Sequence, residues 1–187
     1  MTDIERITEE RPASRAAYEV PPHMRAIVQE RYGSPDMLEL REVATPVPGE
    51  GEVLLRVEAA SLNMYDSHMT SGTPYMARAV AGPMKPKHPI PGADVAGVVV
   101  AVGSGVTRVS PGDEVFGGIG SGAFAEYAVA KERALARKPN GVTFEQAAAV
   151  PLAGLTALQG LRDVGALRAG GRVLVNGASG GVGTFAV

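Results

Sequence analysis

A glycine-rich segment near the end of the chain, Gly177–Gly183, has the spacing most typical of a chemical role. Gly180 and Gly183 keep two of the three glycines of a G-x-G-x-x-G turn, and Ala178 takes the place of the first. In such a turn the middle glycine lets the backbone approach a pyrophosphate, and the last lets helix and strand pack closely. The N–H groups at the helix N-terminus then face the anion. We predict that the following residues bind a dinucleotide: Ser179, Gly180, Gly181, Val182 and Gly183.

The residues on either side of this turn support the same interpretation. The apolar run Val173–Val175 predicts a buried strand over residues 172–176, and Thr184–Val187 predict the opening of a helix. The alternative is a plain tight turn, because a lone glycine motif is weak evidence. A parallel strand needs neighbouring strands, and the sequence given stops one turn into the helix. We therefore expect a truncated chain whose second domain is incomplete and which is catalytically inactive by itself.

The elements that would position this turn fall into three stretches. Residues 1–23 are polar and mixed in charge and predict a flexible tail. Residues 24–149 contain short β-like runs separated by glycine and proline turns, which favour a barrel or sandwich. Within them, residues 73–91 form a long proline-rich connection. Residues 150–187 begin a second domain, and a capping box at Thr143–Gln146 predicts a helix just before it.

Composition narrows the class of protein. The 187 residues are 45% hydrophobic, which is enough for a core, and the formal net charge of −2 gives no electrostatic reason to expect nucleic acid. No apolar run approaches the length of about 18 residues that a membrane-spanning helix needs. The absence of cysteine excludes disulfides and thiolate metal sites, and it fits a reducing, cytoplasmic location.

Several short motifs, taken together, resemble one family. In chain order they are Gly92–Val99, Pro111–Gly117, Gly122–Tyr127, Pro151–Ala157 and Asn176–Gly183. Their order and spacing are similar to those of zinc-independent, quinone-oxidoreductase-like members of the medium-chain dehydrogenase/reductase superfamily, from about Met24 to Val187. The resemblance implies a mostly β, GroES-like, partly open barrel followed by the start of an α/β Rossmann domain that binds NAD(P). It places the active site in the cleft between the two domains.

Zinc divides this superfamily. Its zinc alcohol dehydrogenases hold the catalytic metal with two cysteines and a histidine, and the matching positions here are Asn63, Ala93 and Leu152. Asp94 keeps a carboxylate beside them, but one carboxylate cannot complete a tetrahedral site. The resemblance therefore implies an enzyme without metal, which uses NADPH or, more rarely, NADH to reduce quinones or activated C=C and C=O bonds by hydride transfer.

Such a reaction needs hydrogen-bond donors for the charge that develops on the acceptor oxygen. Asn63 follows a predicted strand at the family's position near the nicotinamide and substrate, and its amide can donate without titrating; an N-cap role for the next helix is the alternative. Tyr65 and His68 lie on the same short segment and could transfer a proton, or could equally be surface or packing residues. Thr156 matches a family position near the nicotinamide, although a helical threonine often bonds its own backbone.

Other functions remain open at this point. An enoyl-thioester reductase is the nearest alternative enzyme. A non-catalytic GroES-like interaction module, left by truncation, would use its exposed apolar strand to bind a partner or to form a homodimer. The residue that selects NADP over NAD lies about 20 residues beyond the glycines, past Val187, so the preference for NADPH rests on the resemblance alone.

Overall fold

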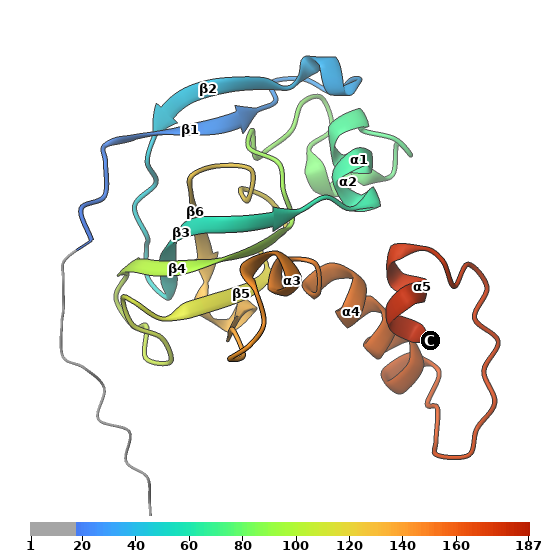
Figure 1. Ribbon diagram of the computed structural model, residues 1–187. Helices are drawn as coiled ribbons and strands as arrows, with labels where there is room; N and C mark the ends of the chain where they lie inside the picture. The colour runs from blue at the N-terminus through green and yellow to red at the C-terminus, as the bar shows by residue number, and fades with distance from the viewer. Residues whose placement is uncertain (1–17) are drawn as a thin grey trace, which may run out of the picture.

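The computed structural model describes residues 18–187, so most of the expected N-terminal tail lies outside the described residues. The described part has two unequal portions (Figure 1). A β-rich domain comes first, and a smaller helical portion with a long open loop projects from its side. Nothing in residues 18–187 forms a helix long and apolar enough to cross a membrane.

The β-rich domain is built on a five-stranded antiparallel sheet in the order β6-β3-β4-β5-β7. Its strands are β3 (Glu52–Ser61), β4 (Asp94–Val102), β5 (Glu114–Gly118), β6 (Tyr127–Lys131) and β7 (Leu135–Arg137). A separate hairpin pairs β1 (His23–Val28) with β2 (Glu39–Ala44), and an isolated bridge from Ala26 to Ala125 joins it to the segment before β6. The two edge strands β6 and β7 do not pair with each other, so the barrel is partly open, as the sequence predicted.

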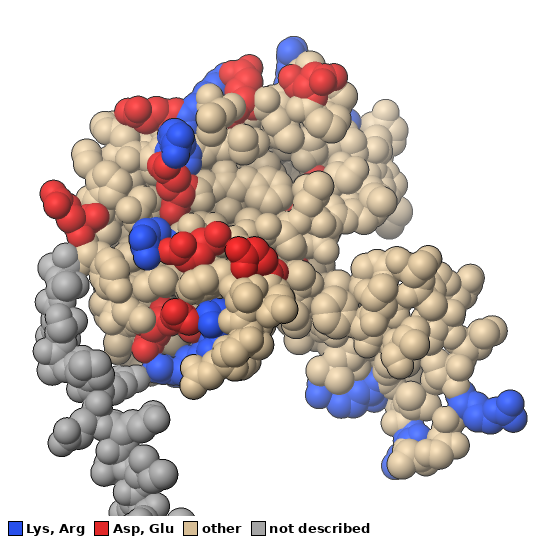
Figure 2. Space-filling view, viewed as in Figure 1, with Lys and Arg blue, Asp and Glu red and all other residues tan. Residues whose placement is uncertain are grey.

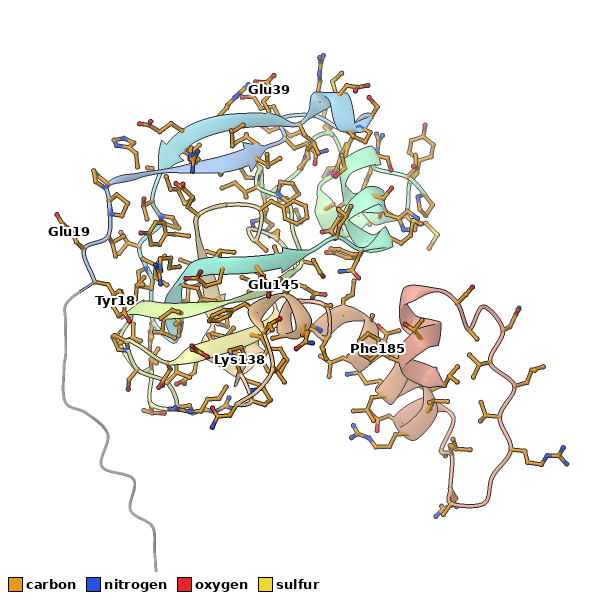
Figure 3. The ribbon with its side chains drawn as sticks, in the orientation of Figure 1. Tyr18, Glu19, Glu39, Lys138, Glu145 and Phe185 are labelled. Carbon is orange, nitrogen blue, oxygen red and sulfur yellow. The ribbon has the colours of Figure 1, made fainter. Side chains whose placement is uncertain are left out.

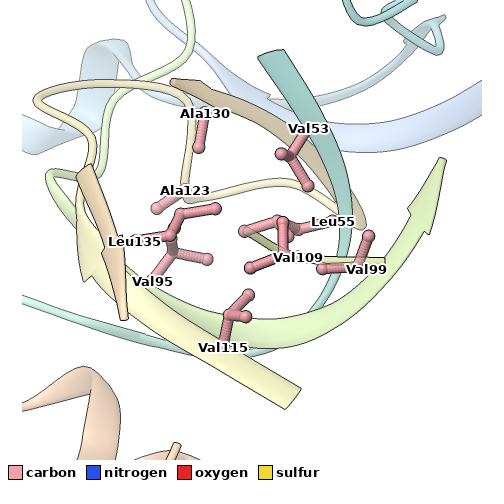
Figure 4. Close-up of a cluster of buried hydrophobic side chains, with 9 residues drawn as sticks. All are labelled: Val53, Leu55, Val95, Val99, Val109, Val115, Ala123, Ala130 and Leu135. Atoms are coloured by element: carbon pink, nitrogen blue, oxygen red, sulfur yellow. The ribbon is translucent and has the colours of Figure 1, made fainter. Parts of the chain in front are cut away.

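Branched aliphatic side chains fill the inside of the curved sheet (Figure 4). The buried cluster contains the following residues: Val53, Leu55, Val95, Val99, Val109, Val115, Ala123, Ala130 and Leu135. The pairing of β3 with β4 shifts register twice, and at the second shift Gly97 lies against the backbone of Arg56, where a Cβ atom would overlap the carbonyl oxygen. The shifts bend the sheet around this core, because an extra residue on one strand increases local twist.

Helices and 3₁₀ turns connect the strands. A 3₁₀ turn follows β1 (Pro35–Met37), and another precedes β7 (Glu132–Ala134). α1 (Met64–Ser71) ends at Gly72, whose φ of 67° gives the left-handed cap that glycine favours. The long connection over residues 73–91 is less irregular than expected, because it contains the short helix α2 (Ala77–Ala81). β7 was not predicted, since its three residues carry no alternating pattern.

The chain leaves the sheet through α3 (Phe144–Ala148), which begins with the predicted capping box. α4 (Pro151–Leu158) follows and continues into a π-helical turn, Gln159–Val164. After the open loop, the chain ends in α5 (Gly181–Ala186), which packs against α4. The predicted strand over residues 172–176 is wrong: this stretch forms no strand, because residues 18–187 offer it no neighbouring strand.

Charge is distributed unevenly over the surface. On the face seen in Figure 2, acidic and basic side chains lie close together over the β-rich domain, whereas the charged side chains visible on the helical portion are basic and lie along its lower edge. Several of the charges form exposed ion pairs, such as Arg25–Glu126 at 2.7 Å and Arg41–Glu30 at 2.6 Å. Exposed pairs of this kind contribute little to stability, about 0–1 kcal/mol each.

Candidate functional site

α1 begins where β3 ends, and its first turn is held by a buried carboxylate. Asn63 is the N-cap residue, and its backbone N–H donates to Asp66 Oδ2 over 2.8 Å. Asp66 Oδ1 accepts the N–H of Ala93, at the start of β4, over 3.1 Å. Only 2% of Asp66 is exposed, and this burial raises the pKa of its carboxyl above the usual value although four backbone N–H groups act to lower it. The first turn of α1 is thereby fixed to the sheet.

Asp94 is a second buried carboxylate. It follows Ala93 and is the first residue of β4. Its Oδ2 accepts hydrogen bonds from Leu152 N–H at 3.0 Å, from Asn63 Nδ2 at 3.1 Å and from Ser61 Oγ at 3.3 Å. Its Oδ1 is buried and has no partner within residues 18–187. Desolvation raises the pKa of the Asp94 carboxyl, while these three bonds act to lower it and the nearby Asp66 charge acts to raise it.

The amide of Asn63 is therefore already engaged. Nδ2 donates to Ser61 Oγ over 3.0 Å as well as to Asp94. An amide nitrogen carries two hydrogens, so neither is left for a substrate oxygen in this arrangement. The expected site role of Asn63 stays a prediction. In the structure its side-chain amide connects Ser61 and Asp94 by hydrogen bonds.

An open cleft of about 340 Å³ lies between the end of the sheet and α4. It is lined by Tyr65, Ala93, Asp94, Gly118, Gly120, Pro151, Leu152, Leu155, Thr156 and Gln159. Tyr65 and Thr156, two of the predicted site residues, both line this cleft, Tyr65 from α1 and Thr156 from α4. The structure thus brings together two residues that lie far apart in the sequence.

Tyr65 is the side chain in this cleft best suited to donate a proton. Its hydroxyl makes no hydrogen bond within the described part of the chain, and the half-buried ring also borders a second cavity beneath the proline-rich connection. Burial, followed by the Asp66 charge, raises the pKa of Tyr65 above its ordinary value of 10.0. The hydroxyl is therefore protonated at neutral pH and available as a donor.

The other predicted residues are placed differently. Thr156 Oγ1 donates to Leu152 O over 2.6 Å, the backbone bond expected of a helical threonine, and keeps its lone pairs as acceptors. His68 is exposed on α1 and does not line the cleft. The glycine turn lies on the far side of α4, and Figure 3 shows Phe185 of α5 directed toward that helix.

The glycine turn has the local form that a phosphate site requires. Its positive φ, 76°, occurs at Gly177, one residue before the position where Ala178 replaces the usual glycine. A Cβ atom at Gly183 would overlap the Gly177 carbonyl oxygen and lie 2.7 Å from Ala178 Cα. Ser179, Gly181 and Val182 are exposed around the start of α5. These residues fit a pyrophosphate, although their role stays a prediction.

Sequence reasoning missed the two carboxylates that organise the site. Asp66 could have been found from the spacing Asn63-x-x-Asp66, which is the spacing of a capping box. Asp94 was noted only as a residue near lost metal positions, yet a lone carboxylate at the start of an apolar strand is itself unusual. Among the described residues, no group of three or more His, Cys, Asp or Glu side chains could hold a metal ion.

Comparison with known proteins gives the family context. Residues 49–140 match the alcohol dehydrogenase GroES-like domain. The quinone oxidoreductase of Lama guanicoe is 40% identical over 166 residues, which are 87% of this chain and 48% of that protein. The 2-methylene-furan-3-one reductase of Solanum lycopersicum is 39% identical and matches 90% of this chain and 44% of its own length. The chain therefore spans about half the length of the curated relatives it matches.

Solved structures show the same similarity at the level of the fold. CurK enoyl reductase superposes with a TM-score of 0.79 at 28% identity, over 89% of this chain and 50% of that one. A mycobacterial protein complexed with NADPH gives 0.75 at 35% identity, over 87% and 47%. A cobalt- and zinc-bound thermostable alcohol dehydrogenase from Pyrobaculum aerophilum gives 0.73 at 34%, over 88% and 54%. The expected fold, a GroES-like domain followed by an incomplete second unit, is confirmed.

Proposed function

Because this chain belongs to the medium-chain dehydrogenase/reductase superfamily, we propose that it forms the substrate-side half of an NAD(P)H-dependent oxidoreductase. The proposed substrates are quinones or enones, which accept a hydride and leave charge on a carbonyl oxygen. The observation that carries the proposal is the hydroxyl of Tyr65, which faces the cleft without a hydrogen-bond partner in residues 18–187.

In the proposed mechanism the nicotinamide supplies the hydride when it is bound. The chain's own residues orient the acceptor and handle the proton. Tyr65 donates its hydroxyl hydrogen bond to the carbonyl oxygen and transfers the proton as charge develops there. Thr156 faces it across the cleft with free lone pairs, and the glycine turn Ser179–Gly183 binds the cofactor's pyrophosphate. The Tyr65 hydroxyl is protonated at neutral pH, and because its pKa is raised it gives up the proton only to the charge that develops on the acceptor oxygen.

We further propose that the reaction needs no metal and uses NADPH, in the cytoplasm. The positions where the zinc enzymes hold their metal are occupied by Asn63, Ala93 and Leu152, none of which is a usual zinc ligand. The similarity to a protein solved with NADPH supports the cofactor, whereas the similarity to a zinc-bound alcohol dehydrogenase makes metal analysis necessary. The activity should survive treatment with a strong chelator, and the purified protein should contain no stoichiometric zinc.

The test follows NADPH oxidation at 340 nm with a naphthoquinone, an enone and an acyl-thioester. Two proteins are compared: the 187-residue chain, and a chimera that joins it to the C-terminal half of the Lama guanicoe enzyme. We expect no turnover by the chain alone and turnover of quinone or enone by the chimera. Tyr65→Phe in the chimera should lower kcat by about 10²-fold with little change in KM, because only a proton donor is removed.

The controls separate failure of folding from failure of the proposal. Tyr75→Phe changes an exposed tyrosine outside the cleft and should leave kcat unchanged. A folded, NADPH-binding chimera that reduces none of the three substrates would contradict the oxidoreductase assignment. Preference for the acyl-thioester would instead favour an enoyl-thioester reductase, which the similarity to CurK enoyl reductase makes the second candidate.

A further inference from the structure

Asp94 is the point where three separate segments of the chain meet. Ser61 ends β3, Asn63 is the N-cap of α1, and Leu152 lies in the first turn of α4. All three donate to the same oxygen, Oδ2, at distances of 3.0 to 3.3 Å. Asp94 is fully buried. A single buried acceptor with three donors from three elements fixes the position of each donor relative to the others.

This acceptor also fixes the orientation of the Asn63 amide. A carboxylate oxygen can only accept hydrogen bonds, so the amide must turn its nitrogen, not its oxygen, toward Asp94. The second amide hydrogen reaches Ser61 Oγ over 3.0 Å, and the Ser61 hydroxyl in turn donates to Asp94. The amide is thus held by two acceptors that are themselves connected.

The same carboxylate connects the two walls of the cleft. Asn63 precedes Tyr65 on α1, whereas Leu152 lies one helical turn before Thr156 on α4. Burying this carboxylate costs free energy, because its other oxygen has no hydrogen-bond partner. Oδ1 is buried, has no partner in residues 18–187, and would lie 3.4 Å from a Cβ atom built on Gly118. An apolar side chain would avoid that cost but would leave three donors unpaired.

We propose that Asp94 is a positioning residue, whose buried carboxylate orients the Asn63 amide and sets the spacing between the wall that carries Tyr65 and the wall that carries Thr156. Its relevance to catalysis rests on the proposed oxidoreductase function. The contacts themselves do not, so they are tested in the 187-residue chain without cofactor or substrate.

The experiment measures hydrogen exchange of the Asn63 side-chain amide and of Leu152 N–H by NMR, with Asn63→Ala used to assign the amide signals. In Asp94→Ala both sites lose their acceptor, and we expect exchange about tenfold faster, which corresponds to loss of one charge-assisted bond. In Asp94→Asn the amide oxygen can occupy the place of Oδ2, so the protection at both sites should be largely restored. Asp94→Leu fills the same space without an acceptor and should not restore the protection, which separates loss of the acceptor from loss of packing.

Two further variants keep the proposal falsifiable. Asp66→Asn changes the other buried carboxylate, which bonds the backbone of Asn63 but not its side chain, so the amide signals should keep their protection. If Asp94→Ala does not fold, Ser61→Ala should expose only one of the two amide hydrogens. Unchanged exchange at Asn63 in Asp94→Ala, or equal loss of both hydrogens in Ser61→Ala, would overturn the proposal. The same Asp94 variants in the chimera should lower kcat more than they raise KM.

Discussion

The side chains around the cleft have two roles. Some can donate a hydrogen bond to a substrate, and others hold the donors in place. Tyr65 has a hydroxyl without a partner in residues 18–187, whereas Asn63 and Thr156 already use their hydrogens on protein acceptors. The two buried carboxylates, Asp66 and Asp94, hold the segments on which these residues lie. Replacing the carboxylates should therefore disturb geometry first and proton transfer only as a consequence.

The buried carboxyl of Asp94 gives a pH prediction. Its pKa is raised in the folded protein above the ordinary value of 3.8, so the folded state holds its proton more tightly than the unfolded state. The stability that this proton contributes is fully present below the unfolded pKa and is lost as pH rises through the folded pKa. The stability of wild type relative to Asp94→Asn should therefore be largest in acid and fall toward neutral pH.

Urea unfolding of both proteins over a series of pH values measures this difference. The exposed acids titrate in both proteins, so their contributions cancel to first order, whereas Asp66 adds a coupled contribution because its charge raises the pKa of Asp94. If the stability of wild type relative to Asp94→Asn instead grew with pH, the folded protein would stabilise the Asp94 carboxylate as an anion. The raised pKa of Asp94 would then be wrong.

Gly183 gives a second prediction at the residue scale. Gly183→Ala places a Cβ atom against the backbone of Gly177 and Ala178, which cannot yield as a side-chain tip can. We expect a loss of about 1–3 kcal/mol in the local stability of the glycine turn and α5, seen as faster amide exchange in that helix. Gly181→Ala, at the first position of the same helix, meets no atom within 4 Å and should be neutral or slightly stabilising.

Among the elements, α3 is the clearest case of local sequence deciding local structure. Thr143 Oγ1 accepts the N–H of Gln146 over 3.2 Å, and Gln146 Oε1 accepts the N–H of Thr143 over 3.0 Å. The two bonds satisfy donors that no helical carbonyl reaches. The buried alanines Ala147 and Ala148 then pack against the sheet. α3 therefore sets the direction in which the chain enters α4.

Removing this cap tests its contribution. Thr143→Ala should lower the free energy of unfolding by about 1 kcal/mol, the usual cost of losing an N-cap hydroxyl. Chemical denaturation monitored by circular dichroism measures it. Thr107→Ala is the matched control, because the side chain of that exposed threonine has no hydrogen bond within residues 18–187. Equal effects of the two substitutions would show that the capping bonds add nothing to stability.

For the whole molecule, the dominant feature is the apolar surface of the helical portion. Leu174 is 95% exposed and Phe185 45%, and Val173 and Val187 are exposed as well. Exposed apolar side chains favour association when they gather on one surface. The stretch over residues 171–175 also forms no strand within residues 18–187, which leaves its backbone groups without a strand partner.

We therefore predict that the 187-residue chain self-associates, either as the homodimer anticipated from the sequence or as larger species. Sedimentation velocity should show a concentration-dependent average mass that rises above 19.3 kDa. Leu174→Lys should weaken the association because it places a charge in this surface. Val47→Lys is the control, since Val47 is 86% exposed but lies on the β-rich domain. A monomer at all concentrations would contradict the prediction.

The sequence by itself determined the elements whose signals are local. Short β-like runs between glycine and proline turns predicted a β-rich first domain, and the Thr143–Gln146 pattern predicted the start of α3. The set of spaced motifs also predicted the GroES-like fold, which the domain match confirms. The domain boundary near residue 150 and the roles of the site residues stay predictions.

Only the tertiary structure decided what depends on contacts between distant residues. The strand expected over residues 172–176 did not form, because a strand exists only through hydrogen bonds to a neighbour. Likewise, no pattern in the sequence shows that Asp94 bonds Leu152, 58 residues away, or that Tyr65 and Thr156 line one cleft. Local chemistry fixed which elements could form, and long-range hydrogen bonding fixed which of them formed and which side chains share the cleft.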